Sequence, residues 1–175
     1  WARAEGLPLM VHAAESPEEV AFLARGEGPL REVYGRFAKT PWTPPGTTPG
    51  RHLRALGVLG PTTLLVHGVQ VDEEEVGLLA ETGTKVVLCP RSNANLEVGE
   101  APLALYAKHG VELALGTDSR GSSPDLDVKN EARFLWGRAE PRLLVRALTR
   151  GGYRALGLPT PRLTRGTPLS LVHFL

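Results

Sequence analysis

Four short apolar runs recur along the chain, and each one ends abruptly at polar residues. The runs cover residues 7–11, 62–66, 85–89 and 111–116. They are apolar on both faces and partly β-branched, which is typical of strands buried in a parallel sheet. The polar residues that follow them include His12, His67, Arg91 and Asp118. The pattern therefore predicts four parallel strands that carry polar side chains at their carboxyl ends.

Helical patterns occupy most of the sequence between these runs. They cover residues 17–26, 73–83, 102–109, 127–138 and 140–156. Ser16 and Asp72 stand where helix N-caps are expected, and Gly26 and Gly83 stand where the first two helices end. Strands that alternate with helices indicate repeated βα units, and hence an α/β fold. The longer connection between residues 26 and 59 contains "TPWTPPGTTPG", which predicts an ordered loop or lid.

Repeated βα units bring the polar residues that follow each strand to one common rim. The side chains expected to converge there are His12, Glu15, His67, Arg91, Asn93 and Asp118. Imidazole and carboxylate groups together suit a divalent metal. Each residue also has a structural explanation, such as a turn for Asp118 or first-turn helix charge for Glu15. Because three of the four strands end in His, His and Asp, the repetition favours the functional explanation.

Length, hydrophobic content and net charge limit the classes of protein to which the chain can belong. The chain has 175 residues, 42% of them hydrophobic, and a net charge of +1 with acids and bases interspersed. These values predict one globular domain with neither a nucleic-acid-binding nor a membrane-binding surface. The single Cys89 excludes an internal disulfide and fits a cytoplasmic location. The excess of Arg over Lys fits a thermophile, and it fits a GC-rich genome equally well.

Three other features are weaker candidates for chemistry. Cys89 lies between an apolar strand and Pro90, so we expect a buried thiol rather than a nucleophile. His109 precedes Gly110 at a predicted helix C-terminus, where its interaction with the helix dipole is sufficient explanation. The turn at residues 120–124 follows Asp118 directly and is a further candidate for substrate contact.

Four motifs, taken in order, resemble a known family. "VHAAES", "LLVHGVQVD", "VVLCPRSNANL" and "LALGTDS" are similar to the second half of the metal-dependent amidohydrolases. The resemblance is strongest to the methylthioadenosine/S-adenosylhomocysteine deaminases, chlorohydrolases and aminodeoxyfutalosine deaminases, and "TPWTPPGTTP" is closest to the last of these. It implies that residues 1–157 form half of a (β/α)₈ TIM barrel, strands five to eight. Residues 158–175 would be a tail, a candidate remnant of the flanking β-sandwich.

The resemblance also implies a role for each residue that matches a motif. His12 and Asp118 would bind the metal, zinc being the first expectation and iron the alternative. Glu15 would shuttle protons, while His67 would contact the substrate and the attacking water. Asp118 would also take a proton from that water. The substrate would further be contacted by Arg91, Asn93 and Ser119.

The implied reaction is deamination of an adenine-like nucleoside by hydroxide that the metal generates from water. A carboxyl such as Glu15, one helical turn from His12, is placed to protonate the ring and then the departing ammonia. Two alternatives stay open. One is a chlorohydrolase or guanidine-cleaving enzyme of the same group, because loops rather than strand-end ligands choose the substrate. The other is a non-catalytic αβ module without a complete metal site.

The sequence departs from the family in lacking the His-x-His motif, which supplies two more ligands. The resemblance therefore implies a C-terminal half that is incomplete and inactive alone. We expect its partner to be the N-terminal half or a second copy of the chain. Without this partner one apolar layer of the barrel would lie open, and its predicted members are Leu9, Val11, Leu65, Val87 and Leu115.

Overall fold

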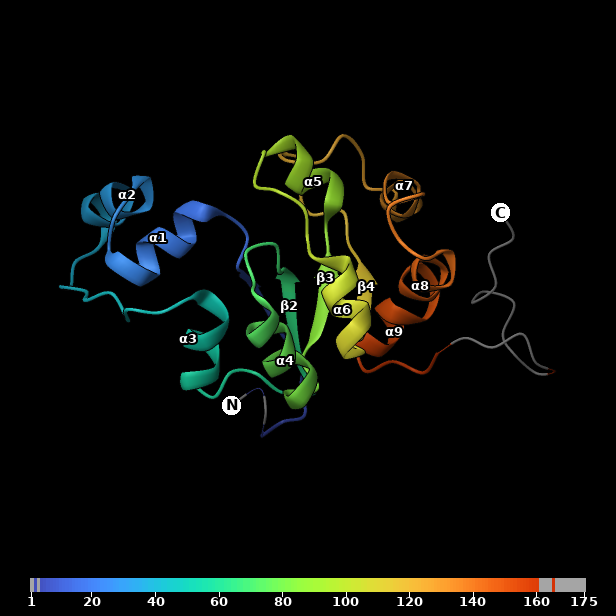
Figure 1. Cartoon of the computed structure of the whole chain (residues 1–175). Coiled ribbons are helices and arrows are strands. Elements are labelled where there is room, and N and C mark those ends of the chain that lie inside the picture. Colours follow the sequence, from blue (N-terminus) through green and yellow to red (C-terminus); the bar gives the residue numbers. More distant parts are fainter. Residues whose placement is uncertain (1, 3, 161–164, 166–175) are drawn as a thin grey trace.

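The computed structural model describes residue 2, residues 4–160 and residue 165. At its centre is a parallel sheet of four strands in the order β1-β2-β3-β4 (Figure 1). The strands are β1 (Leu9–Ala13), β2 (Thr63–His67), β3 (Lys85–Leu88) and β4 (Leu113–Leu115). Their order along the sheet follows their order in the sequence, so the predicted parallel α/β arrangement is confirmed.

Helices surround this sheet and follow each of its strands. They are α1 (Pro17–Arg25), α2 (Pro29–Phe37), α3 (Pro49–Ala55), α4 (Glu73–Thr82), α5 (Pro90–Asn95), α6 (Leu103–His109), α7 (Val128–Phe134), α8 (Pro141–Arg146), the π-helical segment η1 (Ala147–Gly151) and α9 (Gly152–Ala155). In Figure 1, α4 and α6 lie across one face of the sheet, while α5 and α7 lie beyond the carboxyl ends of the strands. The segment η1 and the helix α9 lie beside β4, and α8 packs against η1.

The N-caps that the sequence indicates are present. The hydroxyl of Ser16 accepts a hydrogen bond from the backbone N–H of Glu19 at the start of α1. Asp72 forms a reciprocal capping box with Glu75 at the start of α4. The glycines that follow these helices, Gly26 and Gly83, both adopt the left-handed conformation that ends a helix.

The two faces of the sheet pack differently from the prediction. Leu65 and Leu115 are 0% and 8% exposed, and they belong to the core beneath α4 and α6, with Val11 packed against it. The prediction that these three residues line the open barrel layer is therefore wrong. The opposite face carries Leu64 and Ala114, which cluster with Ala155 of α9. Side chains alternate with a period of two along a strand, so an error of one residue exchanges the two faces.

The long connection from residue 26 to residue 59 contains two helices, α2 and α3, that the pattern did not predict. Each begins with a proline at its first position, where a missing N–H costs nothing. The proline-rich stretch between them is irregular, as expected, and is anchored by Trp42. The Trp42 ring stacks on Phe22 of α1 with centroids 4.2 Å apart. This contact holds the connection against the body of the protein.

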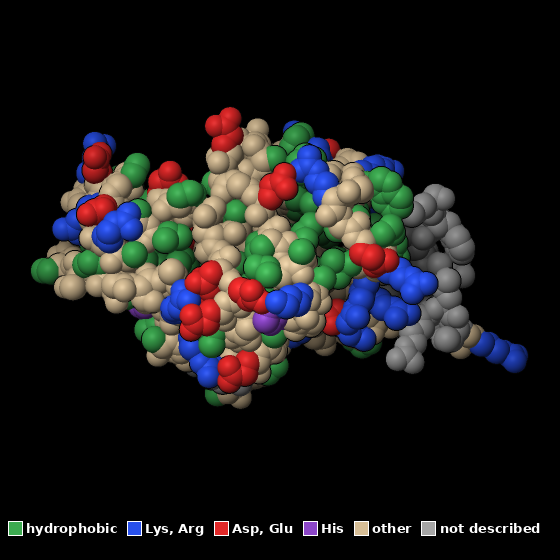
Figure 2. All heavy atoms as spheres, viewed as in Figure 1, with side chains coloured by type: hydrophobic (Ala, Val, Ile, Leu, Met, Phe, Trp, Pro, Cys, Tyr) green, Lys and Arg blue, Asp and Glu red, His purple; other side chains and the backbone are tan. Residues whose placement is uncertain are grey.

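The described surface carries charges of both signs. Acidic and basic side chains are interspersed over the face shown in Figure 2. None of the described helices combines the length and apolar character needed to cross a bilayer. The predicted tail, residues 158–175, lies mostly outside the described residues, so its assignment to a β-sandwich stays a prediction.

Candidate metal centre

Three of the predicted residues meet at the carboxyl ends of the strands. His12 lies in β1, His67 is the last residue of β2, and Asp118 follows β4. One potential ligand atom from each lies within 4.8 Å of the other two. The ring centroids of His12 and His67 are 5.2 Å apart. Residues separated by more than a hundred positions in the sequence therefore form one compact donor group.

The backbone is strained where the strands reach this group. Ala14, His67 and Asp118 have positive φ angles of 54°, 74° and 60°. Among the described non-glycine residues, only Glu97 shares this property. The left-handed region is sparsely populated by such residues and persists where surrounding contacts enforce it, often at functional sites. The strain is thus concentrated where the candidate ligands leave the sheet.

His67 is held by Asn93 of α5. Its Nδ1 lies 2.8 Å from the Asn93 Oδ1 atom, which can only accept, so Nδ1 carries the proton and donates. In the neutral imidazole the other ring nitrogen, Nε2, then keeps its lone pair. It is buried without a hydrogen-bond partner, and the nearest carboxylate oxygen is Oε1 of Glu15 at 3.7 Å. A buried lone pair of this kind is available to a metal or a water molecule.

Asp118 is held by two hydroxyl groups. Ser92 of α5 and Ser122 donate to the same carboxylate oxygen, Oδ2, at 2.6 Å and 2.7 Å. Burial alone would raise the pKa of Asp118, but these bonds and one from the Ser119 backbone outweigh it and lower the pKa below its ordinary value. Asp118 is therefore held as a carboxylate, the form that binds metals.

The two remaining predicted contact residues are already engaged with their neighbours. The Arg91 guanidinium forms two hydrogen bonds of 2.9 Å with Asp125, and its backbone N–H donates to the buried Glu131. Ser119 is exposed, and its hydroxyl accepts from the backbone of Gly121 at 3.2 Å. Substrate contact by Arg91 and Ser119 stays a prediction.

The weaker candidates behave as expected of structural residues. Cys89 is buried, and burial together with nearby carboxylates raises the pKa of its thiol to about 12. A thiol with this pKa is protonated at neutral pH and is a poor nucleophile. His109 ends α6, with its Nε2 atom 3.3 Å from a carboxylate oxygen of Glu73. Neither residue belongs to the donor group.

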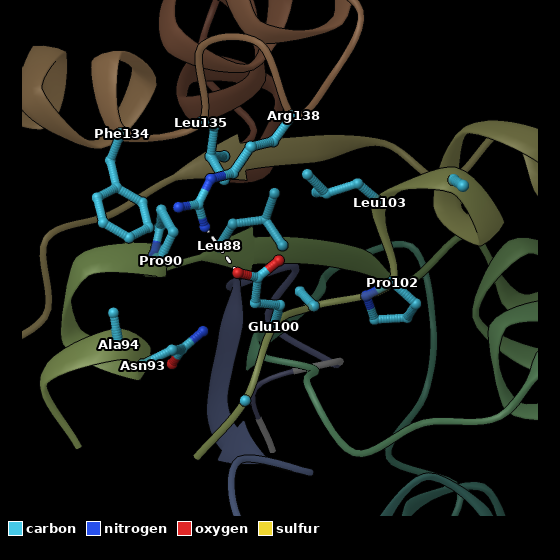
Figure 3. Close-up of a pocket in the computed structure, with 13 residues that line it drawn as sticks. Leu88, Pro90, Asn93, Ala94, Glu100, Pro102, Leu103, Phe134, Leu135 and Arg138 are labelled. Carbon is cyan, nitrogen blue, oxygen red and sulfur yellow. Dashed lines mark hydrogen bonds and ion pairs between the residues drawn. The ribbon is translucent and has the colours of Figure 1, made fainter. Parts of the chain in front are cut away.

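A separate cavity of about 230 Å³ has Asn93 as one of its lining residues (Figure 3). Its lining is mainly apolar, with Leu88, Leu103 and Phe134 among its walls. Arg138 crosses it to reach Glu100 at 2.7 Å, and its guanidinium also lies over the Phe134 ring. None of the three candidate ligands lines this cavity, so it is distinct from the donor group.

Two residues that support the site, Ser122 and Glu19, were not predicted in that role. Ser122 belongs to a turn that was considered only as a substrate contact, yet it binds Asp118. Glu19 was not singled out in the sequence, yet its carboxylate accepts a hydrogen bond from the backbone of Glu15. The Ser16-x-x-Glu19 spacing of a capping box was a visible signal for the second contact. No local pattern marks the first.

The donor group fits a divalent metal. Two imidazoles and one carboxylate are ligands of the kind found in zinc sites. The orphaned, buried Nε2 of His67 has no other described partner. His12 is exposed, which leaves the group open on one side. The residues present are thus suited to a borderline cation such as zinc.

Fold and site together define an α/β protein of the TIM-barrel kind with a rim suited to a divalent metal. The sequence pattern of the amidohydrolase family matches residues 1–174, and the chain belongs to this family. The predicted resemblance is therefore confirmed.

Two relatives that are similar in sequence to this chain are deaminases of this family. The chain is 42% identical to an aminodeoxyfutalosine deaminase of Deinococcus radiodurans, over 95% of this chain and 42% of that protein. It is 34% identical to a 5-methylthioadenosine/S-adenosylhomocysteine deaminase of Halobacterium salinarum, over 99% of this chain and 39% of that protein. The chain thus spans about two fifths of the length of these relatives.

Solved structures show the same fold. An adenosine deaminase of Xanthomonas campestris with bound zinc matches with a TM-score of 0.70 and 31% identity, over 89% of this chain and 34% of that one. The zinc complex of atrazine chlorohydrolase from Arthrobacter aurescens matches with a TM-score of 0.71 and 23% identity, over 90% of this chain and 33% of that one. The second likeness is a likeness of fold alone.

Proposed function

We propose that the protein carrying this chain is a metal-dependent hydrolase that deaminates an adenine-like nucleoside. The observation that supports this most directly is the meeting of His12, His67 and Asp118 within 4.8 Å, with Glu15 adjoining His67. The names of the two relatives above favour a nucleoside over a chlorinated triazine. The preferred substrates are aminodeoxyfutalosine, because of the higher identity, and then methylthioadenosine or S-adenosylhomocysteine.

His12 and Asp118 would hold the metal, zinc in the first instance and iron as the alternative. When bound, such a cation lowers the pKa of water toward neutrality and supplies a nucleophile. Asp118, which its serine partners keep ionised, is placed to accept a proton from that water. The Nε2 lone pair of His67 faces the same space and offers a hydrogen-bond acceptor, or a third ligand.

Glu15 would move the protons that deamination requires. A ring nitrogen must gain a proton as water adds to the neighbouring carbon, and the leaving amine must gain one as it departs. The Glu15 carboxyl is 29% exposed and lies 3.7 Å from His67, so it adjoins both the donor group and solvent. Arg91, Asn93 and Ser119 would line the substrate side of this rim.

The rest of the site would come from outside these residues. We propose that this chain forms strands five to eight of the barrel, and that an N-terminal half supplies further ligands. A second copy of the chain is the alternative partner. We place the protein in the cytoplasm because the one cysteine of this chain is a buried free thiol. The Arg-rich composition fits a thermophilic source.

The test is to express the whole gene that encodes this chain and measure its metal content. Turnover is followed as ammonia release for the nucleosides and guanine, and as chloride release for atrazine. Aminodeoxyfutalosine, methylthioadenosine, S-adenosylhomocysteine and adenosine form the substrate panel, with guanine and atrazine as controls. We expect about one zinc or iron per chain and turnover of at least one adenine nucleoside. Turnover of atrazine alone would favour the chlorohydrolase alternative. A metal-free, inactive product would favour the non-catalytic module.

A further inference from the structure

Glu19 occupies an unusual position in the cap of α1. It stands three residues after the N-cap, Ser16, and its backbone N–H donates to the Ser16 hydroxyl at 3.2 Å. In a standard capping box the side chain would return to the N–H of the cap residue itself. Here the Glu19 Oε2 atom accepts from the N–H of Glu15 at 2.8 Å, one residue earlier. The cap therefore extends to the residue proposed to move protons.

The turn that Glu19 holds is the strained one. Ala14 is fully buried with a φ of 54°, and the next residue, Glu15, donates its N–H to the Glu19 carboxylate. On the other side, the Ala14 carbonyl accepts from the N–H groups of Val69 and Gln70, both at 2.7 Å. Glu19 therefore holds the Ala14–Glu15 turn at Glu15, and the segment after β2 holds it at the Ala14 carbonyl. Because Ala14 lies between β1 and Glu15, its conformation sets the direction in which the Glu15 side chain leaves the strand.

A favourable interaction with the N-terminus of α1 does not explain why residue 19 is a glutamate. Glu18, its neighbour in the first turn of α1, is exposed and already places a negative charge at the helix N-terminus. Glu19 is partly buried, and burial raises the pKa of its carboxyl despite the hydrogen bonds from Glu15 and Ala14. The Glu19 carboxyl is kept at this position despite the cost of partly burying it, and it accepts from the Glu15 backbone, which indicates that this contact is required.

We propose that Glu19 is a positioning residue for Glu15: its side-chain oxygen holds the Ala14–Glu15 turn and so aims the Glu15 carboxyl at His67. The proposal rests on the proton-transfer role given to Glu15 under the proposed function. It requires an oxygen acceptor at the correct reach, which glutamine provides as well as glutamate. Aspartate, one methylene shorter, does not reach.

The test compares Glu19→Ala, Glu19→Gln and Glu19→Asp in the whole protein, with Glu18→Ala as the matched control. We expect Glu19→Ala and Glu19→Asp to lower kcat by about 10- to 100-fold with KM and metal content unchanged, as displacement of a catalytic group does. Glu19→Gln should stay within about threefold of the parent, and Glu18→Ala should match it. Amide hydrogen exchange of the peptide covering residues 13–15 should accelerate in the two slow variants only.

The outcomes separate this proposal from the proposed function. If no substrate is turned over, the proposed function fails, and hydrogen exchange alone decides whether Glu19 holds the turn. If Glu19→Ala leaves exchange and kcat unchanged, or Glu18→Ala lowers kcat equally, the positioning role is wrong. If Glu19→Asp is active and Glu19→Gln is not, negative charge matters rather than reach, and the proposal is overturned. Should Glu19→Ala fail to fold, the Gln and Asp variants still give this comparison.

Discussion

The Asn93 side-chain oxygen accepts the Nδ1 proton of His67 at 2.8 Å and leaves the Nε2 lone pair of that histidine facing the candidate metal centre. Asn93 belongs to α5, a helix of six residues. The preceding residue of the same helix, Ser92, donates to Asp118. One short helix after β3 therefore orients two of the three candidate ligands, which makes it the main support of the site.

Asn93→Ala removes the acceptor that fixes the His67 ring. Loss of a contact of this kind typically lowers metal affinity or activity by about 10- to 100-fold, and we expect a change of this size. Zinc affinity by chelator competition in the whole protein measures it. The matched control is Asn95→Ala, which removes an exposed amide from the same helix. Equal affinities for the Asn93→Ala variant and the parent would contradict the orienting role.

Glu15→Gln and Asp118→Asn separate proton transfer from metal binding. Glu15→Gln keeps the shape of the side chain but removes its titratable proton, so we expect normal metal content and loss of most turnover. Asp118→Asn replaces an anionic ligand by a neutral amide, so metal content and turnover should both fall. Metal analysis and ammonia release on the same preparations provide the measurements. A fully active Glu15→Gln variant would disprove the proton shuttle.

Gly151→Ala tests the contact between η1 and β4. A Cβ atom at Gly151 would lie 2.1 Å from the Leu113 carbonyl oxygen and 3.1 Å from the Ala114 Cα atom. Backbone must move to admit it, so we expect destabilisation of about 1–3 kcal/mol or more. Gly152→Ala is the matched control, since no heavy atom lies within 4 Å of its Cβ position. It should be neutral or stabilising by up to about 1 kcal/mol.

Both glycine variants are compared by urea unfolding of the whole protein. Similar unfolding midpoints for the two variants would mean that η1 does not pack on β4 as closely as described.

Cys89 should resist alkylation in the native protein. With the pKa raised to about 12, about one thiol in ten thousand is ionised at pH 8, and the side chain is buried as well. We expect no modification by iodoacetamide over an hour at pH 8, and complete modification after unfolding in guanidinium chloride. Mass spectrometry records both. Fast native modification would show that the strand end opens to solvent.

The 175-residue chain produced alone should associate. Among the described strands, β1 pairs only with β2. Leu9 and Met10 in β1 are 39% and 53% exposed, and Leu7 just before it is 43% exposed. An unpaired edge with apolar side chains favours pairing with another chain. We expect a dimer or larger species by light scattering, and weak or absent zinc binding. A monomer with tightly held zinc would contradict both the half-barrel and the incomplete site.

Local pattern was sufficient for the elements that repeat. Continuous apolar runs, caps such as Ser16 and Asp72, and glycines at helix ends placed the four strands and the helices α1, α4, α6 and α7. The convergence of His12, His67 and Asp118 also followed from sequence, because parallel strands joined by helices bring their carboxyl ends to one rim. The helices α2, α3 and α5 were not predicted. Each begins at a proline, in stretches whose sequence was read as connecting loop.

Which face each strand residue occupies, and which side chains hold the ligands, was decided by tertiary structure. An apolar run is the same on both faces, so sequence could not tell Leu64 from Leu65, and register alone put Leu65 beneath α4. The partners of the ligands lie far away in sequence: Asn93 is 26 residues from His67, and Ser92 is 26 residues from Asp118. Such bonds depend on how α5 packs over the ends of β2 and β4. Periodicity carries no information on that packing, because it describes one element at a time.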